Sequence, residues 1–466
     1  MQGLVKDLTA LLGHSQVLSH PEEMLAYAND ATHYFKSRVP DVVVFPHTTE
    51  DVSKIMKYSF EQVIPVTPRG AGSGLAGGCT PVHGGIVMDL KRMNKIIEIE
   101  QNNMTTIVEA GVVLKPFQDM LEKRRLFYPP DPQSASVCTI GGNIATRAGG
   151  PRGVKYGTTG NYVTGLEVVL PDGTVINPGG KFVKQSVGYD LTRLMTGSEG
   201  TLGVITRANL RLLPFPEANR TIVVVTDTLE QAAEIVSEIT GRGAVPAMVE
   251  FLTKMAIAVM NSYFSPPLPA DGEGYLLMYF DGTESQVEYE ARVVTEICND
   301  LKAKEIRLVD DKEAANNYWT ARANVYPLIQ TIFQRATTED ITVPRNKLPE
   351  LVRTVQSIAA EEGIMIGLAG HAGDGNMHPS VLFTQITPEI LEKADIAVDR
   401  LIRAGLDMGG TISGEHGIGI HKAKYLEWEL GLVQIELMKG IKKVFDPKGI
   451  MNPGKIWMEE GGDVHV

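Results

Sequence analysis

The sequence predicts an α+β protein with more than one domain, and three observations support this expectation. The chain has 466 residues, more than one ordinary hydrophobic core accommodates. Its first part alternates short apolar strands with amphipathic helical segments, such as "DVVVFP" before "TEDVSKIMKYSFEQ". Its later part contains two consecutive units of strand, helix and strand.

The first part of the chain reads as a mixed domain. After its first strand and helix come the strands "VIPVTP", "GIVMDL" and "TTIVEAG", and then the helical "VLKPFQDMLEKRR". From about 128 to 215, short strands alternate with glycine and proline turns, as in "TGLEVVLPDGTVI". A region so rich in turns is typical of a chain that wraps a ligand or packs a sheet edge.

The tandem units follow the proline-containing "LLPFPEANR". The first unit is "TIVVVTD", "LEQAAEIVSEITGRG" and "AMVEFL", and the second is "GYLLMYFDG", "QVEYEARVVTEICNDLKAK" and "IRLVDD". This arrangement predicts a ferredoxin-like antiparallel sheet with helices on one face. We expect domains at 1–215 and 216–410, with the segment 411–466 returning to the first domain.

Composition excludes several classes of partner. The 44 Lys and Arg against 56 Asp and Glu leave a formal charge of −12, so a nucleic acid is not expected as a partner. No apolar run approaches the roughly 18 residues of a membrane span, and the start "MQGLVKDLTALLGHSQ" lacks the pattern of a signal peptide. A cytoplasmic protein is expected. The three cysteines form no C-x-x-C pair, which disfavours an iron–sulfur cluster.

A glycine-rich loop, "TPRGAGSGLAGGCTP", contains G-x-G-x-x-G at Gly72, Gly74 and Gly77. A Rossmann site needs a helix to begin within these glycines, but here more glycine and proline follow before a strand. A Walker A loop needs a closing Gly-Lys-Ser/Thr, which is missing. The remaining interpretations are a loop whose backbone N–H groups surround an anion such as a pyrophosphate, or a flexible surface loop.

Two further glycine-rich segments lie downstream, "PPDPQSASVCTIGGNIATRAGGPRGVKYG" and "DLTRLMTGSEGTLGVIT". One such segment is common in proteins without a ligand, whereas three together indicate close approach of the backbone to a large ligand.

Two histidines flank a turn signal in "GLAGHAGDGNMHPSVLF". The Asp374-Gly375 pair predicts a two-residue hairpin turn, which would place His371 directly opposite His378. Their Cβ atoms would then lie about 5 Å apart on one face, a separation that suits two imidazoles on one cation.

A second motif, "SGEHGIG", offers Glu415 and His416. Two imidazoles and one carboxylate would make a three-ligand metal site with open positions, as a catalytic metal needs. The alternative is that each histidine hydrogen-bonds a neighbouring loop.

The chain resembles the FAD-linked oxidoreductases of the vanillyl-alcohol oxidase and p-cresol methylhydroxylase superfamily. The resemblance rests on "PRGAGSGLAGG", "TIGGNIATRAGG" with "KYG", "GSEGTLGVIT" and "MNPGKI". It implies a two-part FAD-binding domain with an α+β cap domain for the substrate. It also implies non-covalent FAD, because members with covalent FAD attach it through a histidine in this loop, whereas here the loop has Ser73 and no histidine before His83. The implied FAD contacts are Pro68, Arg69, Gly70, Ala71, Gly72, Ser73, Gly74, Gly77, Gly78, Pro130, Asp131, Thr139, Gly141, Gly142, Asn143, Ala145, Gly149, Gly150, Gly200, Val204, Ile205 and Asn452.

Within this superfamily, "HAGDGNMHP" and "SGEHGIG" resemble the FAD-dependent D-2-hydroxyacid dehydrogenases. In the metal-dependent members, the matching positions imply that His371, His378 and Glu415 bind a divalent cation such as zinc, manganese or iron. The resemblance further implies that His416 is the catalytic base that takes the substrate's hydroxyl proton, while hydride leaves C2 for flavin N5. It also makes Asn376 a candidate substrate contact.

The substrate carboxylate needs a partner, and Arg322 in "YWTARANVYP" is the candidate, with an ordinary helix-surface arginine as the alternative. Relatives that take dicarboxylates carry a lysine in the region that matches "RATTEDITVPRNKLP". Here the acidic Glu339 and Asp340 would repel a second carboxylate, so we expect a small monocarboxylate, D-lactate or glycolate.

The electrons are expected to leave to a separate protein, because the chain has no second cofactor motif. The resemblance implies an electron-transferring flavoprotein, which we favour, or the iron–sulfur subunit that serves glycolate oxidase. Two other functions stay open at this point. One is a metal-dependent hydrolase, in which the histidines and Glu415 activate water; the other is a redox-neutral flavoprotein such as an ether-lipid synthase.

Overall fold

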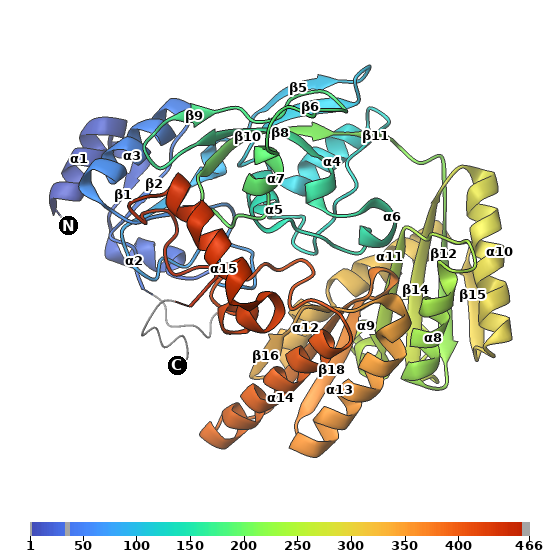
Figure 1. Ribbon diagram of the computed structural model, residues 1–466. Helices are drawn as coiled ribbons and strands as arrows, with labels where there is room; N and C mark the ends of the chain where they lie inside the picture. The colour runs from blue at the N-terminus through green and yellow to red at the C-terminus, as the bar shows by residue number, and fades with distance from the viewer. Residues whose placement is uncertain (1, 33–37, 459–466) are drawn as a thin grey trace. The chain divides into compact units, whose positions relative to one another are not determined.

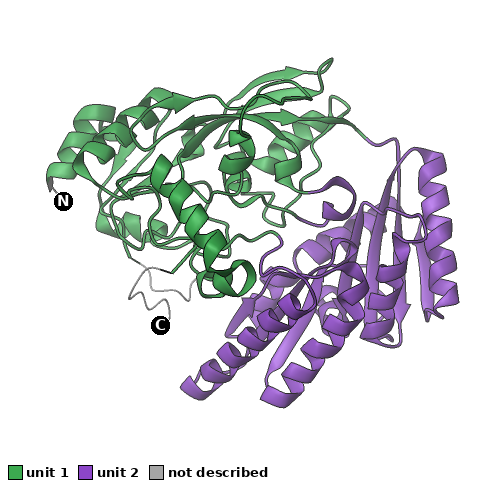
Figure 2. Cartoon of the chain, viewed as in Figure 1, with its two compact units in different colours: residues 1–149, 158–215, 415–466 green, residues 150–157, 216–414 purple. Residues whose placement is uncertain are grey.

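The computed structural model describes residues 2–32 and 38–458 (Figure 1). Contacts divide the chain into two compact units, shown in Figure 2. Unit 1 comprises residues 1–149, 158–215 and 415–466, and unit 2 comprises residues 150–157 and 216–414. Helix and strand are mixed throughout, which confirms the predicted class. Among the described helices, none is long and apolar enough to cross a membrane.

Unit 1 begins with a four-stranded sheet in the order β1-β2-β4-β3. The strands are β1 (Val17–Leu18), β2 (Val42–Val44), β3 (Val66–Arg69) and β4 (Ile86–Asp89). Helix α3 (Thr49–Gln62) starts at a capping box between Thr48 and Asp51 and ends before β3, so that β2, β4 and β3 run parallel. Its buried side chains Ile55 and Met56 join the apolar core of this sheet.

The second sheet of unit 1 is antiparallel, in the order β5-β6-β10-β8-β9. Its strands are β5 (Ile96–Glu100), β6 (Thr105–Glu109), β10 (Val204–Arg211), β8 (Val163–Val169) and β9 (Val175–Ile176). A small ribbon pairs β7 (Leu126–Phe127) with β11 (Leu213–Pro214). The helices of unit 1 besides α3 are α1 (Gln2–Leu12), α2 (Pro21–Met24), α4 (Leu114–Glu122), α5 (Ile140–Thr146), α7 (Leu191–Met195) and α15 (Leu426–Phe445).

Unit 2 contains one eight-stranded antiparallel sheet in the order β15-β12-β14-β13-β18-β19-β16, with β17 also paired to β19. The strands are β12 (Ala218–Thr226), β13 (Met248–Thr253), β14 (Gly274–Gly282), β15 (Glu305–Val309), β16 (Arg335–Thr338), β17 (Ile341–Thr342), β18 (Met365–His371) and β19 (Asn376–Phe383). The helices are α6 (Gly153–Tyr156), α8 (Leu229–Ile239), α9 (Lys254–Tyr263), α10 (Glu284–Asp300), α11 (Lys312–Ala323), α12 (Val325–Ile332), α13 (Leu348–Glu362) and α14 (Pro388–Asp407).

The predicted tandem units form β12-α8-β13 and β14-α10-β15. Their four strands lie side by side in the order β15-β12-β14-β13, which is the ferredoxin-like arrangement expected from the sequence. The sheet then continues through β18 and β19, which extend it beyond the predicted motif.

The expectation of helices on one face of this sheet was wrong. Helices α8 and α10 contact β12 and β14. Helices α9, α11 and α12 share a second core with the side chains of Val223 and Val225, which alternate with Ile222 and Val224 along β12. Both faces are therefore covered, and this explains why β12, β13 and β14 are nearly continuous runs of buried residues.

Candidate active site

The glycine-rich loop starts directly after β3 and packs against the buried side chain of Arg69. The Nη1 atom of Arg69 donates to the carbonyl of Asn29 at 2.8 Å and lies 3.2 Å from the sulfur of Cys79. A side chain at Gly72 would collide with the Arg69 guanidinium, and the φ angle of Gly72 is +71°. Position 72 therefore requires glycine, and the positive charge of Arg69 lies next to the loop.

The backbone N–H groups of this loop are hydrogen-bond donors that a ligand can use. Within the described chain, no hydrogen bond uses the N–H groups of Ala71, Gly72, Ser73 or Gly74. The loop is not part of a helix or strand, and its glycines keep side chains away from these amides. Four successive amides next to the Arg69 charge suit the pyrophosphate of a dinucleotide.

The separate glycine segments of the sequence meet at this loop. A side chain at Gly70 would collide with the hydroxyl of Thr139, the residue that caps α5. A Cβ at Gly200, whose φ is +70°, would lie 3.2 Å from Cγ of Pro68. The tertiary structure therefore brings all three segments together, as a shared ligand requires.

The C-terminal motif is attached to the same place. The side-chain amide of Asn452 donates to the carbonyls of Gly78, at 2.8 Å, and Glu199, at 2.7 Å. The carboxylate of Glu199 accepts the N–H groups of Ile418, at 2.8 Å, and Gly419, at 2.7 Å. Burial raises the pKa of Glu199, although these two N–H groups act in the opposite direction. Glu199, which the sequence analysis missed, holds the backbone that follows His416.

The other predicted FAD contacts lie in loops, in α5, in the apolar core of unit 1 and at the start of the segment 150–157. The carbonyl of Pro130 accepts from Gln118, and the carbonyl of Ala145 accepts the N–H of Glu199. Val204 belongs to the apolar core of unit 1. Gly150 opens the segment 150–157 of unit 2. The remaining predicted residues lie in the same three segments or at their ends: Gly77, Asp131, Gly141, Gly142, Asn143, Gly149 and Ile205.

The histidine hairpin forms at the predicted turn, but the predicted register was wrong. Residues 372–374 make a 3₁₀ turn, Gly375 has a φ of +87°, and His371 lies opposite Asn376, while His378 lies opposite Ala369. The loop consists of residues 372–375, so its centre lies one residue earlier than predicted, and this shifts the pairing by two positions. Because side chains alternate with a period of two, this shift keeps both histidines on one face of the sheet.

The two imidazoles lie close together and each has a defined acceptor. Their ring centroids are 5.1 Å apart with an interplanar angle of 83°. Nδ1 of His371 is 2.6 Å from Oε1 of Glu250, and Nδ1 of His378 is 3.2 Å from the carbonyl of Glu339. With a proton on each Nδ1, Nε2 is the nitrogen of each ring that can bind a metal.

Glu415, the third predicted ligand, belongs to unit 1, whereas His371 and His378 belong to unit 2. A carboxylate is a usual metal ligand beside two imidazoles. Nε2 of the neighbouring His416 is 3.8 Å from Oε1 of Glu415, and a Cβ at Gly149 would lie 2.8 Å from Oε2 of Glu415.

Asn376 and Arg322 are both buried, with exposed fractions of 5% and 7%. The side-chain oxygen of Asn376 has no hydrogen-bond partner among the described residues, so it can receive a donor from a ligand. Arg322 is not a surface residue: its Nη2 lies 2.5 Å from Oε2 of Glu250. The predicted substrate arginine is thus already paired with a carboxylate that the sequence analysis did not select.

Glu250 is completely buried in β13 between two positively charged or ionisable partners. Burial raises its pKa, but the charges of Arg322 and His371, and the hydrogen bond with His371, outweigh this effect and lower the pKa of Glu250 below its ordinary value. A sequence signal was present, because Glu250 is the one charged residue of the apolar "AMVEFL". A lone acid in a buried strand is expected to have a partner.

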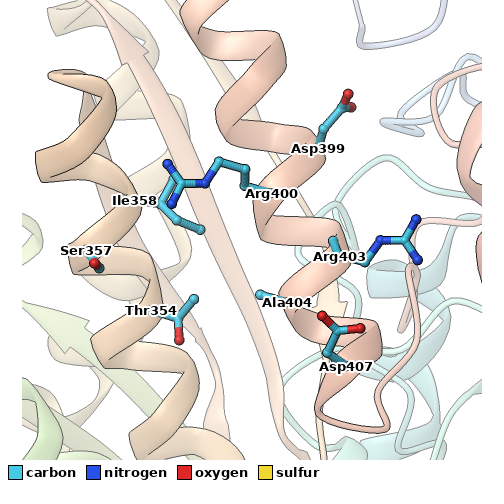
Figure 3. A pocket seen from close by; sticks show the side chains of 8 residues that line it. All are labelled: Thr354, Ser357, Ile358, Asp399, Arg400, Arg403, Ala404 and Asp407. Atoms are coloured by element: carbon cyan, nitrogen blue, oxygen red, sulfur yellow. The ribbon is translucent and has the colours of Figure 1, made fainter.

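A surface hollow lies between α13 and α14, away from the predicted motifs in the sequence (Figure 3). Its charged lining includes Arg400, which pairs with Glu361 and Glu362. None of the predicted site residues lines it, and surface ion pairs with Glu361 and Glu362 account for Arg400.

The sequence matches two family models: the C-terminal domain of FAD linked oxidases over residues 215–456, and an FAD binding domain over residues 40–179. A glycolate oxidase subunit of Bacillus subtilis is 39% identical, over 94% of this chain and 93% of its own length. A D-lactate dehydrogenase of Anaerostipes hadrus is 36% identical, over 91% of this chain and 90% of its own. The solved structure of p-cresol methylhydroxylase with substrate bound has a TM-score of 0.80 and 20% identity, covers 99% of this chain and 98% of that one, and shows likeness of fold.

Proposed function

Because this chain belongs to the FAD-linked oxidases and is an oxidoreductase of the D-lactate dehydrogenase and glycolate oxidase type, we propose that it oxidises a small D-2-hydroxy acid to the 2-oxo acid. D-lactate is the proposed substrate, and glycolate is the alternative. The observation that carries the proposal is the pair His371 and His378 on one face of the unit 2 sheet, with their ring centroids 5.1 Å apart. The hydrolase alternative is set aside, because it leaves the FAD-binding segments without a role.

The chain's residues fit FAD held without a covalent bond. The amides of residues 71–74 and the charge of Arg69 would face the pyrophosphate, with the segments at Thr139 and Gly200 alongside. When bound, FAD supplies the two-electron acceptor for the hydride removed from the substrate. Release of all yellow colour in denaturant would support the non-covalent attachment, and colour that stays on the unfolded chain would contradict it.

We further propose that His371, His378 and Glu415 hold a divalent cation, zinc, manganese or iron, because two imidazoles and a carboxylate are ligand types that these cations take. A cation bound there would lower the pKa of the substrate hydroxyl. In the proposed reaction His416 accepts the hydroxyl proton as C2 gives up its hydride. His416 is partly buried and adjacent to Glu415, so the base and the cation ligand come from one turn that Glu199 holds.

Asn376 and Arg322 would bind the substrate. The unpartnered oxygen of Asn376 can accept a hydrogen bond, and its position opposite His371 places it beside the cation ligands. Arg322 uses Nη2 for Glu250, and its buried Nε has no hydrogen-bond partner among the described residues. The guanidinium therefore keeps a donor for the substrate carboxylate.

The preference for a small monocarboxylate rests on the buried acids of the 339–340 pair. Glu339 and Asp340 are both completely buried, and Oδ2 of Asp340 accepts the hydroxyl of Ser413. Two acidic groups at low dielectric would oppose a second carboxylate nearby. On the same face as His378, the hydroxyls of Thr338 and Ser380 meet at 2.8 Å, which adds polar bulk and no positive charge.

Electrons are proposed to pass to an electron-transferring flavoprotein, with an iron–sulfur subunit as the alternative partner. The deciding experiment is the anaerobic visible spectrum of the metal-replete protein before and after addition of D-lactate, L-lactate or glycolate. Bleaching by D-lactate alone would support the proposal. Bleaching by glycolate but not D-lactate would select the glycolate alternative, and an oxidised flavin that none of the acids reduces would contradict the reaction.

A further inference from the structure

We propose that Glu250 is a positioning residue for cation binding: it orients His371 so that Nε2 of the ring faces the cation, and Arg322 holds Glu250 from its other oxygen. This inference rests on the proposed function, since it assumes that the histidine pair binds a cation. It assigns a role to a residue that lies far from both histidine motifs in the sequence.

The strand register places Glu250 and His371 as neighbours. Phe251 of β13 pairs with Gly370 of β18, and the two strands are antiparallel, so the next residues along them, Glu250 and His371, face each other. Opposed residues have their side chains on one face. The 2.6 Å separation between Nδ1 of His371 and Oε1 of Glu250 follows from this geometry.

The carboxylate of Glu250 lies in a buried, apolar part of β13, where an ionised group is costly without partners. Its neighbours Val249, Phe251 and Leu252 are buried and apolar, so Glu250 is the one charged residue among the buried residues 248–252 of this strand. An ionised carboxylate with no exposed surface is costly unless both oxygens have partners. Oε1 is hydrogen-bonded to His371, whereas Oε2 is ion-paired with Nη2 of Arg322 at 2.5 Å and accepts no hydrogen bond from the described residues.

A carboxylate that accepts from Nδ1–H determines both the tautomer and the ring orientation of a histidine. Without it, the His371 ring could rotate or carry its proton on Nε2, and its lone pair would then be turned away from the cation. A role limited to neutralising Arg322 would leave cation affinity independent of Glu250, and this difference makes the inference testable.

The test is the affinity of the FAD-loaded, metal-free protein for Co²⁺, followed by its visible absorption and by competition with a chromophoric chelator. Glu250→Gln should weaken Co²⁺ binding by about 10- to 100-fold, as expected for loss of an outer carboxylate partner. His371→Ala should weaken it at least as much. The matched control is Glu290→Gln in α10: Glu290 is also a buried glutamate of unit 2, 4% exposed, and hydrogen-bonds Gln286. The Co²⁺ affinity of Glu290→Gln should equal that of the parent protein.

Flavin content and the thermal unfolding transition show whether each variant folds. If Glu250→Gln does not fold, Glu250→Asp decides, because it keeps a charge for Arg322 but shortens the reach to His371; weaker Co²⁺ binding supports the inference and parental affinity overturns it. Parental affinity in a folded Glu250→Gln overturns the inference while the proposed cation site stands. A parent protein that binds neither Co²⁺, Zn²⁺ nor Mn²⁺ overturns the cation site itself, and the inference with it.

Discussion

Asn452 allows a quantitative test of how the C-terminal motif is held on the glycine loop. The residue is 2% exposed, has a φ of +41°, and donates two hydrogen bonds through its side-chain amide. Asn452→Ala removes both bonds, at about 0.5–1.5 kcal/mol each, and puts alanine in the left-handed region at about 1–2 kcal/mol. The expected loss is about 2–5 kcal/mol of unfolding free energy for unit 1.

Asn452→Gly separates the two contributions, because glycine loses the same hydrogen bonds without the backbone strain. We expect Asn452→Gly to be about 1 kcal/mol more stable than Asn452→Ala. The assay is urea unfolding of the FAD-loaded protein, followed by the flavin fluorescence that rises on release and by circular dichroism. A glycine variant no more stable than the alanine variant would refute the backbone argument, and parental stability in both would refute the hydrogen-bond argument.

Other consequences are open to measurement. His416→Gln should keep FAD and Co²⁺ binding but reduce the rate of flavin reduction by D-lactate by about 10²–10⁴-fold; an unchanged rate would exclude it as the base. Removal of the cation by a chelator should stop flavin reduction while the oxidised flavin spectrum stays, and added Zn²⁺ or Mn²⁺ should restore the reaction; full activity in the chelated protein would count against the cation. Burial raises the folded-state pKa of Glu199. The contribution of Glu199 to the unfolding free energy is therefore fully present below about pH 4.3, its ordinary pKa, and is lost as the pH rises through the raised pKa of the folded protein. In urea unfolding, the difference in stability between the parent protein and Glu199→Gln should become smaller as the pH rises. Ile55→Ala, at a side chain with no exposed surface in the core of unit 1, should cost about 2–5 kcal/mol; a loss below 1 kcal/mol would mean that the site collapses around the cavity.

Local patterns were sufficient to predict many elements. The helix "TEDVSKIMKYSFEQ" and the strand "GYLLMYFDG" form with the predicted bounds, as α3 and β14, because capping, amphipathicity and apolar runs act within a few residues. The turn between His371 and His378 was also predicted, since Asp-Gly favours the left-handed conformation found at Gly375.

The register and the partners of the site were beyond local reasoning. His371 lies opposite Asn376 because the 3₁₀ turn starts the loop directly after His371, and the carbonyl of Gly375 accepts the N–H of Val343, a residue outside the hairpin. Arg322 looked like a substrate ligand in the sequence, and the structure pairs it with Glu250, which is 72 positions away along the chain.

The sequence by itself determined which residues carry the chemistry: three glycine-rich segments, two histidines on one face of a hairpin, and the Glu415-His416 pair. Only the tertiary structure decided that Gly70 meets Thr139, that Glu199 holds the turn after His416, and that Glu250 joins Arg322 to His371. The physical reason is that periodicity and turn chemistry act between near neighbours in the chain, whereas sheet order and packing select the partners of a buried charge such as Glu250, which are 72 and 121 positions away.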